Sequence, residues 1–312
     1  MNEPARELRK LTLSIAAVER DTGLSKDTLR IWERRYGFPQ PERDGVGERA
    51  YPLEQVEKLR IVKRLMDNGH RPGRLVPMSM DELQTLSAST LDSPQSVAKG
   101  LAAPDLKPYI ALMRSHDLDA LRRQLMLAQM RLGVARFIME VVLPLNTMVG
   151  DAWMRGQLDI FEEHAYIECL QSVLRLALNG IPEAAGCDRP RVLLTTFPGE
   201  PHGLGLLLAE CLFALEGARC VPLGVQTPVW DISLAATAYR CDIVALGFTG
   251  CMNPNQVVDG LQELRGKLAP AVELWVGGAA PVLHRRSVDG VTALGLLSDI
   301  RVELERWRHG SA

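Results

Sequence analysis

A glutamate and a histidine stand two positions apart in a glycine-rich loop, FPGEPHGLG, which covers residues 197–205. The apolar run RVLLTT precedes the loop, and LLLAECLFAL, with helical apolar spacing, follows it. Glycine-rich loops between a strand and a helix usually bind phosphate through backbone N–H groups. This loop instead places an imidazole, that of His202, at its tip. Imidazole is the commonest metal ligand, but a histidine in such a loop is more often structural, so the loop alone leaves both possibilities open.

A second group of chemically useful residues lies upstream, where Trp153 is followed after nine residues by Glu163 and His164. Trp153 falls at the end of an expected helix, and the Glu–His pair falls in the first turn of the next helix, which Asp159 is expected to cap. A helix-loop-helix corner can bring these side chains to one edge. The alternative for this fragment alone is a core tryptophan beside a solvated Glu–His pair.

The histidine loop opens an alternation of strands and helices. The apolar runs RVLLTTFP, RCVPLGV, DIVALGF, AVELWVGG and GVTAL predict strands, and helices are expected to start near Gly203, Val229, Pro254, Val282 and Leu296. The pattern predicts a doubly wound, five-stranded parallel α/β (Rossmann-like) domain over residues 187–312, with ligands at the carboxyl ends of the strands. The loop lacks the G-x-G-x-x-G pattern of a dinucleotide site.

Residues 105–186 show helical apolar spacing with breaks that predict a four-helix bundle. Residues 79–104 are rich in Ser, Thr, Pro and small side chains, with one weak helical signal at MDELQTL. We expect an exposed, mobile linker there. The chain is therefore predicted to be multidomain.

The N-terminal segment, residues 1–78, predicts a winged helix-turn-helix. A short helix over Ser14 to Arg20, a turn at Thr22-Gly23 and a helix capped by Ser25 precede a glycine-rich hairpin in PERDGVGERAYP. This segment has 16 Lys and Arg against 12 Asp and Glu, a net charge of +4, whereas the remainder of the chain has −6. The helix capped by Ser25 fits a DNA major groove, and the basic hairpin can contact phosphates. The alternative is a small helical domain with scattered arginines.

Composition excludes several classes of protein. The chain has 312 residues, of which 46% are hydrophobic and 24% charged, so it is too apolar to be disordered and long enough for two or three domains. No apolar stretch is long and uncharged enough to cross a membrane, and the N-terminus has no signal core, so we expect a cytoplasmic protein without membrane contact. The cysteines form no CxxC pair, which favours buried thiols over metal ligands; they are Cys169, Cys187, Cys211, Cys220, Cys241 and Cys251.

The N-terminal pattern T-L-R-x-W-E-x-R-Y-G, followed by P-x-R and R-x-Y, resembles the MerR superfamily of winged-helix regulators over about residues 11–78. The resemblance implies double-stranded operator DNA as a partner and Trp32 as a core residue. The metal-responsive members carry a cysteine after the dimerisation helix, whereas this chain has no cysteine before Cys169. Candidate DNA-contacting residues are Lys26, Thr28, Arg30, Arg34, Arg35, Arg43, Arg49 and Tyr51.

The C-terminal pattern Glu200-x-His202-x-x-Gly205, with a later Gly277-Gly278, resembles the cobalamin-binding domain. The resemblance implies that His202 is the lower ligand of cobalt, and that Glu200 accepts a hydrogen bond from its other ring nitrogen. It also implies that Gly205, Gly277 and Gly278 leave room for the nucleotide tail. Gly247 replaces the serine that would meet this tail. Thr249 is the candidate to supply that hydroxyl.

The spacing W-x9-E-H, taken with the other two domains, resembles light-dependent repressors of the CarH and LitR type. The resemblance implies that Trp153, Glu163 and His164 contact the adenosyl group or the upper face of adenosylcobalamin. It also implies a homo-oligomer, dimer or tetramer, that depends on the cofactor. In that family a histidine after the tryptophan binds cobalt once light has broken the Co–C bond. Met154 takes its place here, and this puts the switch of upper ligand in question.

The sequence therefore predicts a cobalamin-dependent transcriptional regulator, a repressor that can respond to light, and not an enzyme. One alternative keeps the architecture but senses haem, or the redox or ligand state of cobalamin, without light control; His202 and either Met154 or a cysteine would then be axial ligands. Another is a corrinoid methyl carrier, but such enzymes normally need a separate catalytic barrel.

Overall fold

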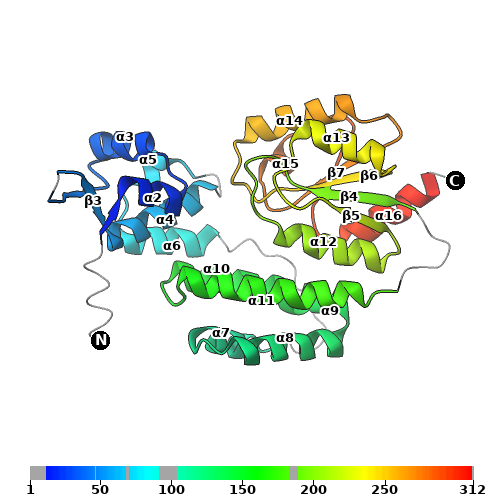
Figure 1. Cartoon of the computed structure of the whole chain (residues 1–312), viewed down its shortest axis with the longest axis horizontal. Helices are drawn as coiled ribbons and strands as arrows, with labels where there is room; N and C mark the ends of the chain where they lie inside the picture. Colours follow the sequence, from blue (N-terminus) through cyan, green and yellow to red (C-terminus); the bar gives the residue numbers. More distant parts are fainter. Residues whose placement is uncertain (1–11, 46, 68–69, 91–103, 183–188, 311–312) are drawn as a thin grey trace. The chain divides into compact units, whose positions relative to one another are not determined.

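The computed structural model describes residues 12–45, 47–67, 70–90, 104–182 and 189–310 (Figure 1). The chain divides into two compact units, Met1–Ser96 and Val97–Ala312. Each unit is considered by itself. Within the described residues, no helix is long and apolar enough to cross a membrane.

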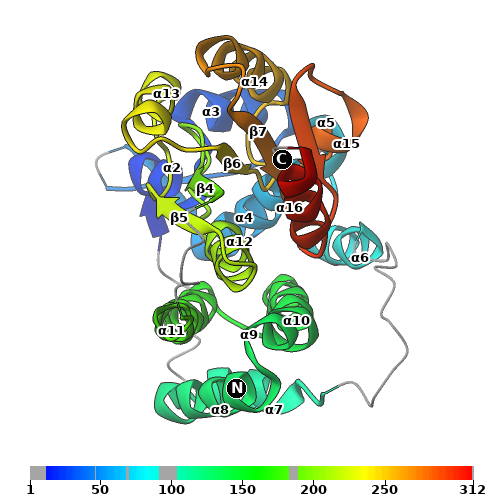
Figure 2. The same cartoon turned by 90° about the vertical axis from the view of Figure 1, so that its right-hand side faces the viewer.

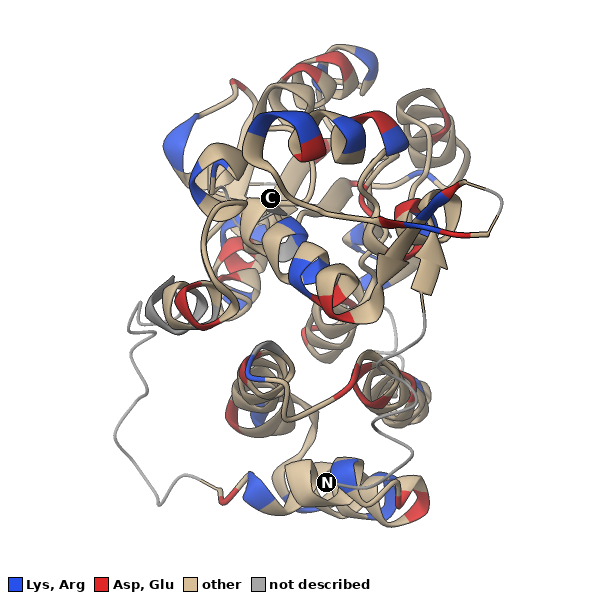
Figure 3. Cartoon of the chain, turned by 90° about the vertical axis from the view of Figure 1, so that its left-hand side faces the viewer, with Lys and Arg blue, Asp and Glu red and all other residues tan. Residues whose placement is uncertain are grey.

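The first unit is a winged helix. Its elements are β1 (Thr12–Ser14), α2 (Ile15–Thr22), α3 (Lys26–Tyr36), β2 (Glu42–Arg43), β3 (Arg49–Pro52), α4 (Leu53–Asp67), α5 (Pro72–Leu75) and α6 (Met80–Thr90). The Ser14 side chain accepts from the Ala17 amide and that of Ser25 from the Thr28 amide, so each serine caps its helix. The three strands form an antiparallel sheet in the order β1-β3-β2. Lys and Arg recur along α3 (Figure 3).

Helix α6 corrects the prediction of a mobile linker over residues 79–104. Ser79 and Glu82 form a reciprocal cap: the Ser79 amide donates to Glu82 Oε2 at 2.7 Å, and the Glu82 amide donates to Ser79 Oγ at 3.2 Å. Leu83 is fully buried in the core of the first unit. Residues 80–90 therefore belong to the winged-helix unit, while residues 91–103 lie outside the described residues.

The second unit begins with the predicted four-helix bundle. Its elements are α7 (Lys107–Arg114), α8 (Leu118–Leu132), α9 (Val134–Phe137), the π-helical segment η1 (Ile138–Val142), α10 (Leu143–Met154) and α11 (Ile160–Asn179). The segments α9, η1 and α10 follow one another without a break and together make the third of the four helices. Figures 1 and 2 show α7 and α8 on one side of the α10–α11 layer and the sheet domain on the other.

The sheet domain has the predicted five parallel strands, in the order β5-β4-β6-β7-β8. The strands are β4 (Arg191–Thr195), β5 (Arg219–Pro222), β6 (Ile243–Gly247), β7 (Glu273–Gly277) and β8 (Val291–Leu294). The helices are α12 (Leu204–Leu215), α13 (Val229–Ala238), α14 (Pro254–Lys267), α15 (Val282–Arg285) and α16 (Asp299–Gly310). Side chains of α12 and α16 pack on one face of the sheet, and those of α13, α14 and α15 on the other.

Helix α12 joins the bundle to the sheet. Its buried residues Leu207, Leu208 and Cys211 are part of the bundle core, whereas Leu206 and Phe213 pack with the sheet residues. An α-helix that is apolar on two faces can be covered on both sides. The bundle therefore lies against the helix that directly follows the histidine loop.

Candidate cofactor site

The histidine loop lies at the switch point of the sheet. Strand β4 is flanked by β5 on one side and β6 on the other, so the chain leaves β4 in one direction and later returns on its other side. Ligands of doubly wound sheets bind at this point, beyond the carboxyl ends of the strands. The loop after β4 carries Glu200 and His202, and the loop after β6 carries Thr249 and Cys251.

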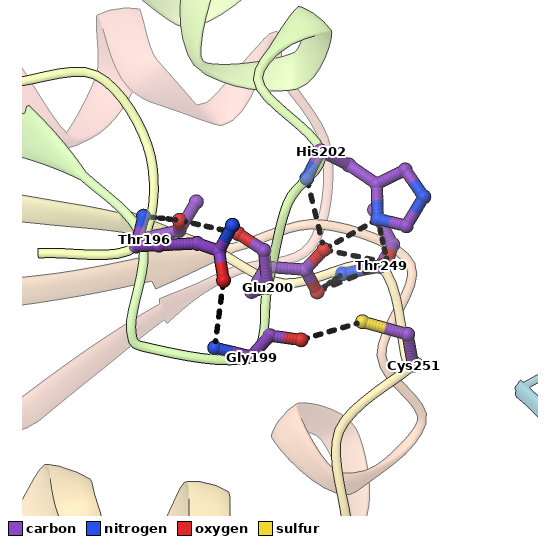
Figure 4. Close-up of polar contacts among 7 residues, drawn as sticks. Thr196, Gly199, Glu200, His202, Thr249 and Cys251 are labelled. Carbon is purple, nitrogen blue, oxygen red and sulfur yellow. Dashed lines mark hydrogen bonds and ion pairs between the residues drawn. The ribbon is translucent and has the colours of Figure 1, made fainter. Parts of the chain in front are cut away.

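Glu200 and His202 form the hydrogen-bonded pair that the resemblance to the cobalamin-binding domain implies. His202 Nδ1 lies 2.6 Å from Glu200 Oε1, and the Glu200 side chain is completely buried while that of His202 is 57% exposed (Figure 4). With an ionised carboxylate as acceptor, Nδ1 carries the proton and Nε2 has a lone pair. The described residues give Nε2 no hydrogen bond. This ring is therefore oriented to bind a ligand on its Nε2 side.

Thr249, in the loop after β6, holds the Glu200 carboxylate in place. Its amide donates to Glu200 Oε2 at 2.7 Å, and its hydroxyl lies 3.0 Å from each carboxylate oxygen. The same Oγ1 lies 3.1 Å from His202 Nδ1. The sequence predicted Thr249 as a candidate hydroxyl for the nucleotide tail; in the structure its hydroxyl contacts the Glu–His pair.

Glu200 is ionised despite its burial. Burial raises its pKa, but the hydrogen bonds from His202, from the amide and hydroxyl of Thr249 and from the Cys251 thiol outweigh burial and hold the pKa at about 2. A carboxylate that accepts several hydrogen bonds keeps its charge in this way. The charge orients the imidazole and makes Nε2 a stronger ligand.

Two residues of this loop region were not identified from the sequence. Thr196 is fully buried, and its hydroxyl donates to the Glu200 carbonyl at 2.6 Å and accepts from the Gln226 amide at 2.8 Å. Cys251 was expected to be a buried thiol, but it is partly exposed and donates to the Gly199 carbonyl at 3.4 Å. The burial expectation is correct for Cys169, Cys211 and Cys241, whereas Cys220 is partly exposed and Cys187 lies outside the described residues.

The glycines predicted to clear a path for a ligand have different surroundings. A Cβ on Gly205 would meet no atom within 4 Å, and one on Gly277 would come no closer than 3.8 Å to Leu294. Gly278 has φ +117°, and a Cβ there would lie 2.1 Å from the Phe248 carbonyl oxygen, so the fold itself requires this glycine. At Gly247 a Cβ would lie 3.2 Å from Leu206 Cδ2. The side chain of Leu206 therefore packs where a serine side chain would begin.

The tryptophan and the Glu–His pair lie on either side of the turn between α10 and α11. Trp153 is partly buried against the bundle core, Glu163 is partly buried and His164 is exposed. Leu204, two residues after His202, packs against the same core. The Met154 side chain lies outside the described part of the structure.

The predicted cap of α11 is present and has an additional contact. Glu162 Oε2 accepts from the Asp159 amide at 2.7 Å, as in a capping box. Glu162 Oε1 lies 2.9 Å from Nε2 of His116, in the α7–α8 turn. His116, which was not identified from the sequence, thus ties that turn to the start of α11.

The predicted DNA-contacting side chains lie on α3 and on the hairpin of β2 and β3, with one correction. Tyr51 is completely buried and belongs to the core, because its position in the short β3 strand points the ring inward. Trp32 is 4% exposed, which confirms its core position. Arg30, Arg34, Arg35 and Arg43 are exposed, and Lys26, Thr28 and Arg49 are partly so.

Some of these polar side chains already have partners within the unit. Arg49 Nε donates to Glu33 Oε2 at 2.9 Å, a bond that raises the arginine pKa. Lys26 pairs with Glu19 at 3.6 Å, and Arg30 with Asp27 at 3.1 Å. Exposed pairs of this kind are weak and can be exchanged for phosphate contacts.

Two family matches agree with these two sites. The MerR HTH family regulatory protein family matches residues 13–75, and the B12 binding domain family matches residues 106–177, which are the bundle. The chain is 30% identical over 275 residues to the HTH-type transcriptional repressor CarH of Myxococcus xanthus, covering 84% of this chain and 87% of that protein. It is also 30% identical over 280 residues to the repressor CarA of the same organism, covering 89% and 90%. The chain belongs to this family of MerR-type, B12-binding transcriptional repressors.

A solved structure supports the fold of the second unit. The monomethylamine corrinoid protein of Methanosarcina barkeri has a TM-score of 0.50 and 16% identity, and the match covers 64% of this chain and 96% of that one. The predicted order of winged helix, bundle and Rossmann-like sheet is confirmed. The family is one of transcription regulators, as predicted, and not of enzymes.

The residues at the switch point fit a cobalamin. An imidazole with a carboxylate on Nδ1 and an accessible Nε2 has the donor set of an axial cobalt ligand. The Glu–His pair comes from the α/β domain, while the B12 binding family matches the bundle. Both parts of the second unit are therefore needed to describe a cobalamin site.

Proposed function

We propose that this chain is a cobalamin-dependent transcriptional regulator, a repressor that binds operator DNA through its first unit and adenosylcobalamin through its second. The observation that carries the cofactor assignment is the orientation of His202. Its Nδ1 is held by the buried, ionised Glu200 and its Nε2 is accessible. His202 would bind cobalt from below, and Gly205 and Gly277 would leave room for the nucleotide tail.

The upper face would be covered by the α10–α11 corner. Trp153 and Leu204 pack against the same bundle core, which ties this corner to the start of α12 and so to the histidine loop. Trp153 would pack beside the adenosyl group, and Glu163 and His164 would contact that group or the upper face. When bound, adenosylcobalamin supplies a Co–C bond that light can break. In the loaded protein, Trp153, Glu163 and His164 would cover the upper face of the cofactor and exclude water from it.

The regulatory output would be a change of assembly and of DNA affinity. A homo-oligomer presents several winged helices to an operator with repeated half-sites. We infer that the cofactor state changes the dimer or tetramer, because the cofactor would lie between the two parts of the second unit and change how they pack.

The test is to load the full chain in the dark with adenosylcobalamin and, in a separate sample, with haem. His202→Ala should lose tight cobalamin retention and the absorbance change that histidine ligation causes, while circular dichroism shows an intact fold. His284→Ala replaces another exposed histidine, in α15, and serves as the matched control. Unchanged cobalamin retention by His202→Ala would refute the ligand assignment, and stable binding of haem in preference to cobalamin would refute the choice of cofactor.

A further inference from the structure

Three potential metal ligands of different chemistry meet at the switch point. One atom each from Glu200, His202 and Cys251 lies within 4.8 Å of the other two. The ring nitrogen on this side is Nδ1, because it lies 2.6 Å from Glu200 Oε1. In Figure 4 the thiol of Cys251 and the imidazole of His202 approach the carboxylate from different loops.

This donor set suits a borderline-soft divalent ion. Carboxylate, imidazole and thiolate are the three ligand types that Zn²⁺ binds in proteins, and the order of affinities also favours Zn²⁺ over Mn²⁺ or Fe²⁺. Thr249 Oγ1, 3.0 Å from both Glu200 oxygens, holds the carboxylate in place. Cys251 is held over the loop by its bond to the Gly199 carbonyl, so its sulfur is positioned before any ion arrives.

We propose that, in the absence of cobalamin, Glu200, His202 Nδ1 and Cys251 bind a divalent zinc-type ion. The Cys251 thiol gives its proton to solvent and becomes a thiolate. The Nδ1 proton of His202 is also displaced, and the neutral ring then carries its proton on Nε2. The carboxylate of Glu200 exchanges its hydrogen bond from Nδ1 for a bond to the ion.

This ion and the cobalamin would exclude each other. With Nδ1 on the ion and a proton on Nε2, His202 has no lone pair left for cobalt. This consequence, unlike the ion site itself, rests on the proposed function. A bound zinc-type ion would thus keep the regulator in its cobalamin-free state until the cofactor displaces it.

The ion site is tested on the full chain without cobalamin, with Co²⁺ as a spectroscopic probe. A thiolate ligand produces a near-ultraviolet charge-transfer band, and added Zn²⁺ should remove that band. Cys251→Ser should abolish the band, and Glu200→Gln should weaken Co²⁺ binding by at least about tenfold, the loss typical of removing even a group that only supports a metal ligand. Cys220→Ser is the matched control, because burial raises the pKa of the Cys220 thiol to about 12 and its thiolate is therefore unavailable.

A missing band, or a band that survives Cys251→Ser, would overturn the ion site. Mutual exclusion is tested by adding Zn²⁺ before adenosylcobalamin: cobalamin uptake should fall in the parent and recover in Cys251→Ser. Equal uptake with and without Zn²⁺ would overturn the exclusion. Failure of the parent to bind cobalamin at all would refute the proposed function instead, and the Co²⁺ result would stand, because that measurement contains no cobalamin.

Discussion

The carboxylate of Glu200 connects the two loops that carry the site. Five of its hydrogen bonds come from two residues, His202 on its own loop and Thr249 on the other. Because Glu200 is fully buried, each donor compensates for part of the cost of placing a charge away from water. The strength of His202 as a ligand therefore depends on Glu200, whose carboxylate contacts the imidazole at Nδ1 and leaves Nε2 accessible.

Thr249→Val should weaken cobalamin retention by about 10- to 100-fold, as is typical when a group supporting a metal ligand is removed. The valine keeps the backbone amide that donates to Glu200 Oε2 and removes only the hydroxyl. Thr249→Ser keeps the hydroxyl and should bind as the parent does. Retention is measured by gel filtration of the loaded protein. Equal retention by the parent and Thr249→Val would show that the hydroxyl does not support the ligand.

At the scale of the elements, the two glycines at the end of β7 should respond differently to the same substitution. Gly278→Ala should lower the free energy of unfolding by at least about 2 kcal/mol, because φ is +117° and the new Cβ would lie 2.1 Å from the Phe248 carbonyl. Gly277→Ala should change it by less than about 1 kcal/mol. If the nucleotide tail passes Gly277, Gly277→Ala should lose cobalamin affinity even though its stability changes little. Urea unfolding and cobalamin titration of both variants separate the two roles.

Strand β7 and helix α16 are joined by the partly exposed carboxylate of Glu273. Trp275 is fully buried, and its Nε1 donates to Glu273 Oε2 at 2.8 Å, while Arg306 binds the same carboxylate. Glu273→Ala leaves the indole N–H without this acceptor and should cost about 1–3 kcal/mol of unfolding free energy at pH 7. Glu273→Gln keeps an acceptor oxygen and should cost less.

The same contact predicts a dependence on pH. Burial raises the pKa of Glu273, but the hydrogen bonds from Arg306 and Trp275 outweigh it, so the pKa lies below its ordinary 4.5. A carboxylate with a depressed pKa stabilises the fold above pH 4.5 and loses that contribution as the pH falls through the folded-state pKa. The stability difference between the parent and Glu273→Ala should therefore be constant near neutral pH and shrink below pH 4.5. A difference that grows on acidification would contradict this assignment.

Local patterns were sufficient to predict most elements. The expected helix starts at Val229, Pro254 and Val282 are those observed. The last helix starts at Asp299, three residues after the expected Leu296, and the Asp299 carboxylate accepts from the Leu296 amide at 2.8 Å. The weak helical signal at MDELQTL lies within α6, but the prediction of a mobile linker was wrong there, because Leu83 is buried in the core of the first unit.

The site was predictable only in part. The pairing of Glu200 with His202 was predicted by the resemblance to the cobalamin-binding domain, because the spacing alone left a structural histidine possible. Thr249 meets Glu200 across 49 positions of sequence, and this contact follows from the pairing of β4 with β6, which no local pattern specifies. The same limit applies to Tyr51, whose side of β3 depends on how the strand packs against the helices.

At the scale of the whole molecule, the first unit should account for DNA binding. Arg34→Ala and Arg35→Ala remove exposed charges from α3, and each should weaken operator binding and reduce the salt slope by about 1 if it contacts a phosphate. Arg49→Ala also breaks the ion pair with Glu33, so Glu33→Gln is its control for stability. Fluorescence anisotropy at several salt concentrations measures the slopes. Operator binding by a chain that lacks residues 1–96 would refute the assignment.

The response to light should depend on the residue after Trp153. A histidine there would bind cobalt after photolysis, and Met154 offers a thioether, which matches Co(III) poorly. We therefore expect the parent either to lose light control or to use His164, which is exposed in the first turn of α11 beside the same corner. The adenosylcobalamin complexes of the parent, Met154→His and His164→Ala are illuminated, and their absorbance and oligomeric state compared. Met154→His should give a stable bis-imidazole spectrum; such a spectrum in the parent that survives His164→Ala would refute the role of His164. An oligomeric state unchanged by light in the parent and in Met154→His would exclude photoreception.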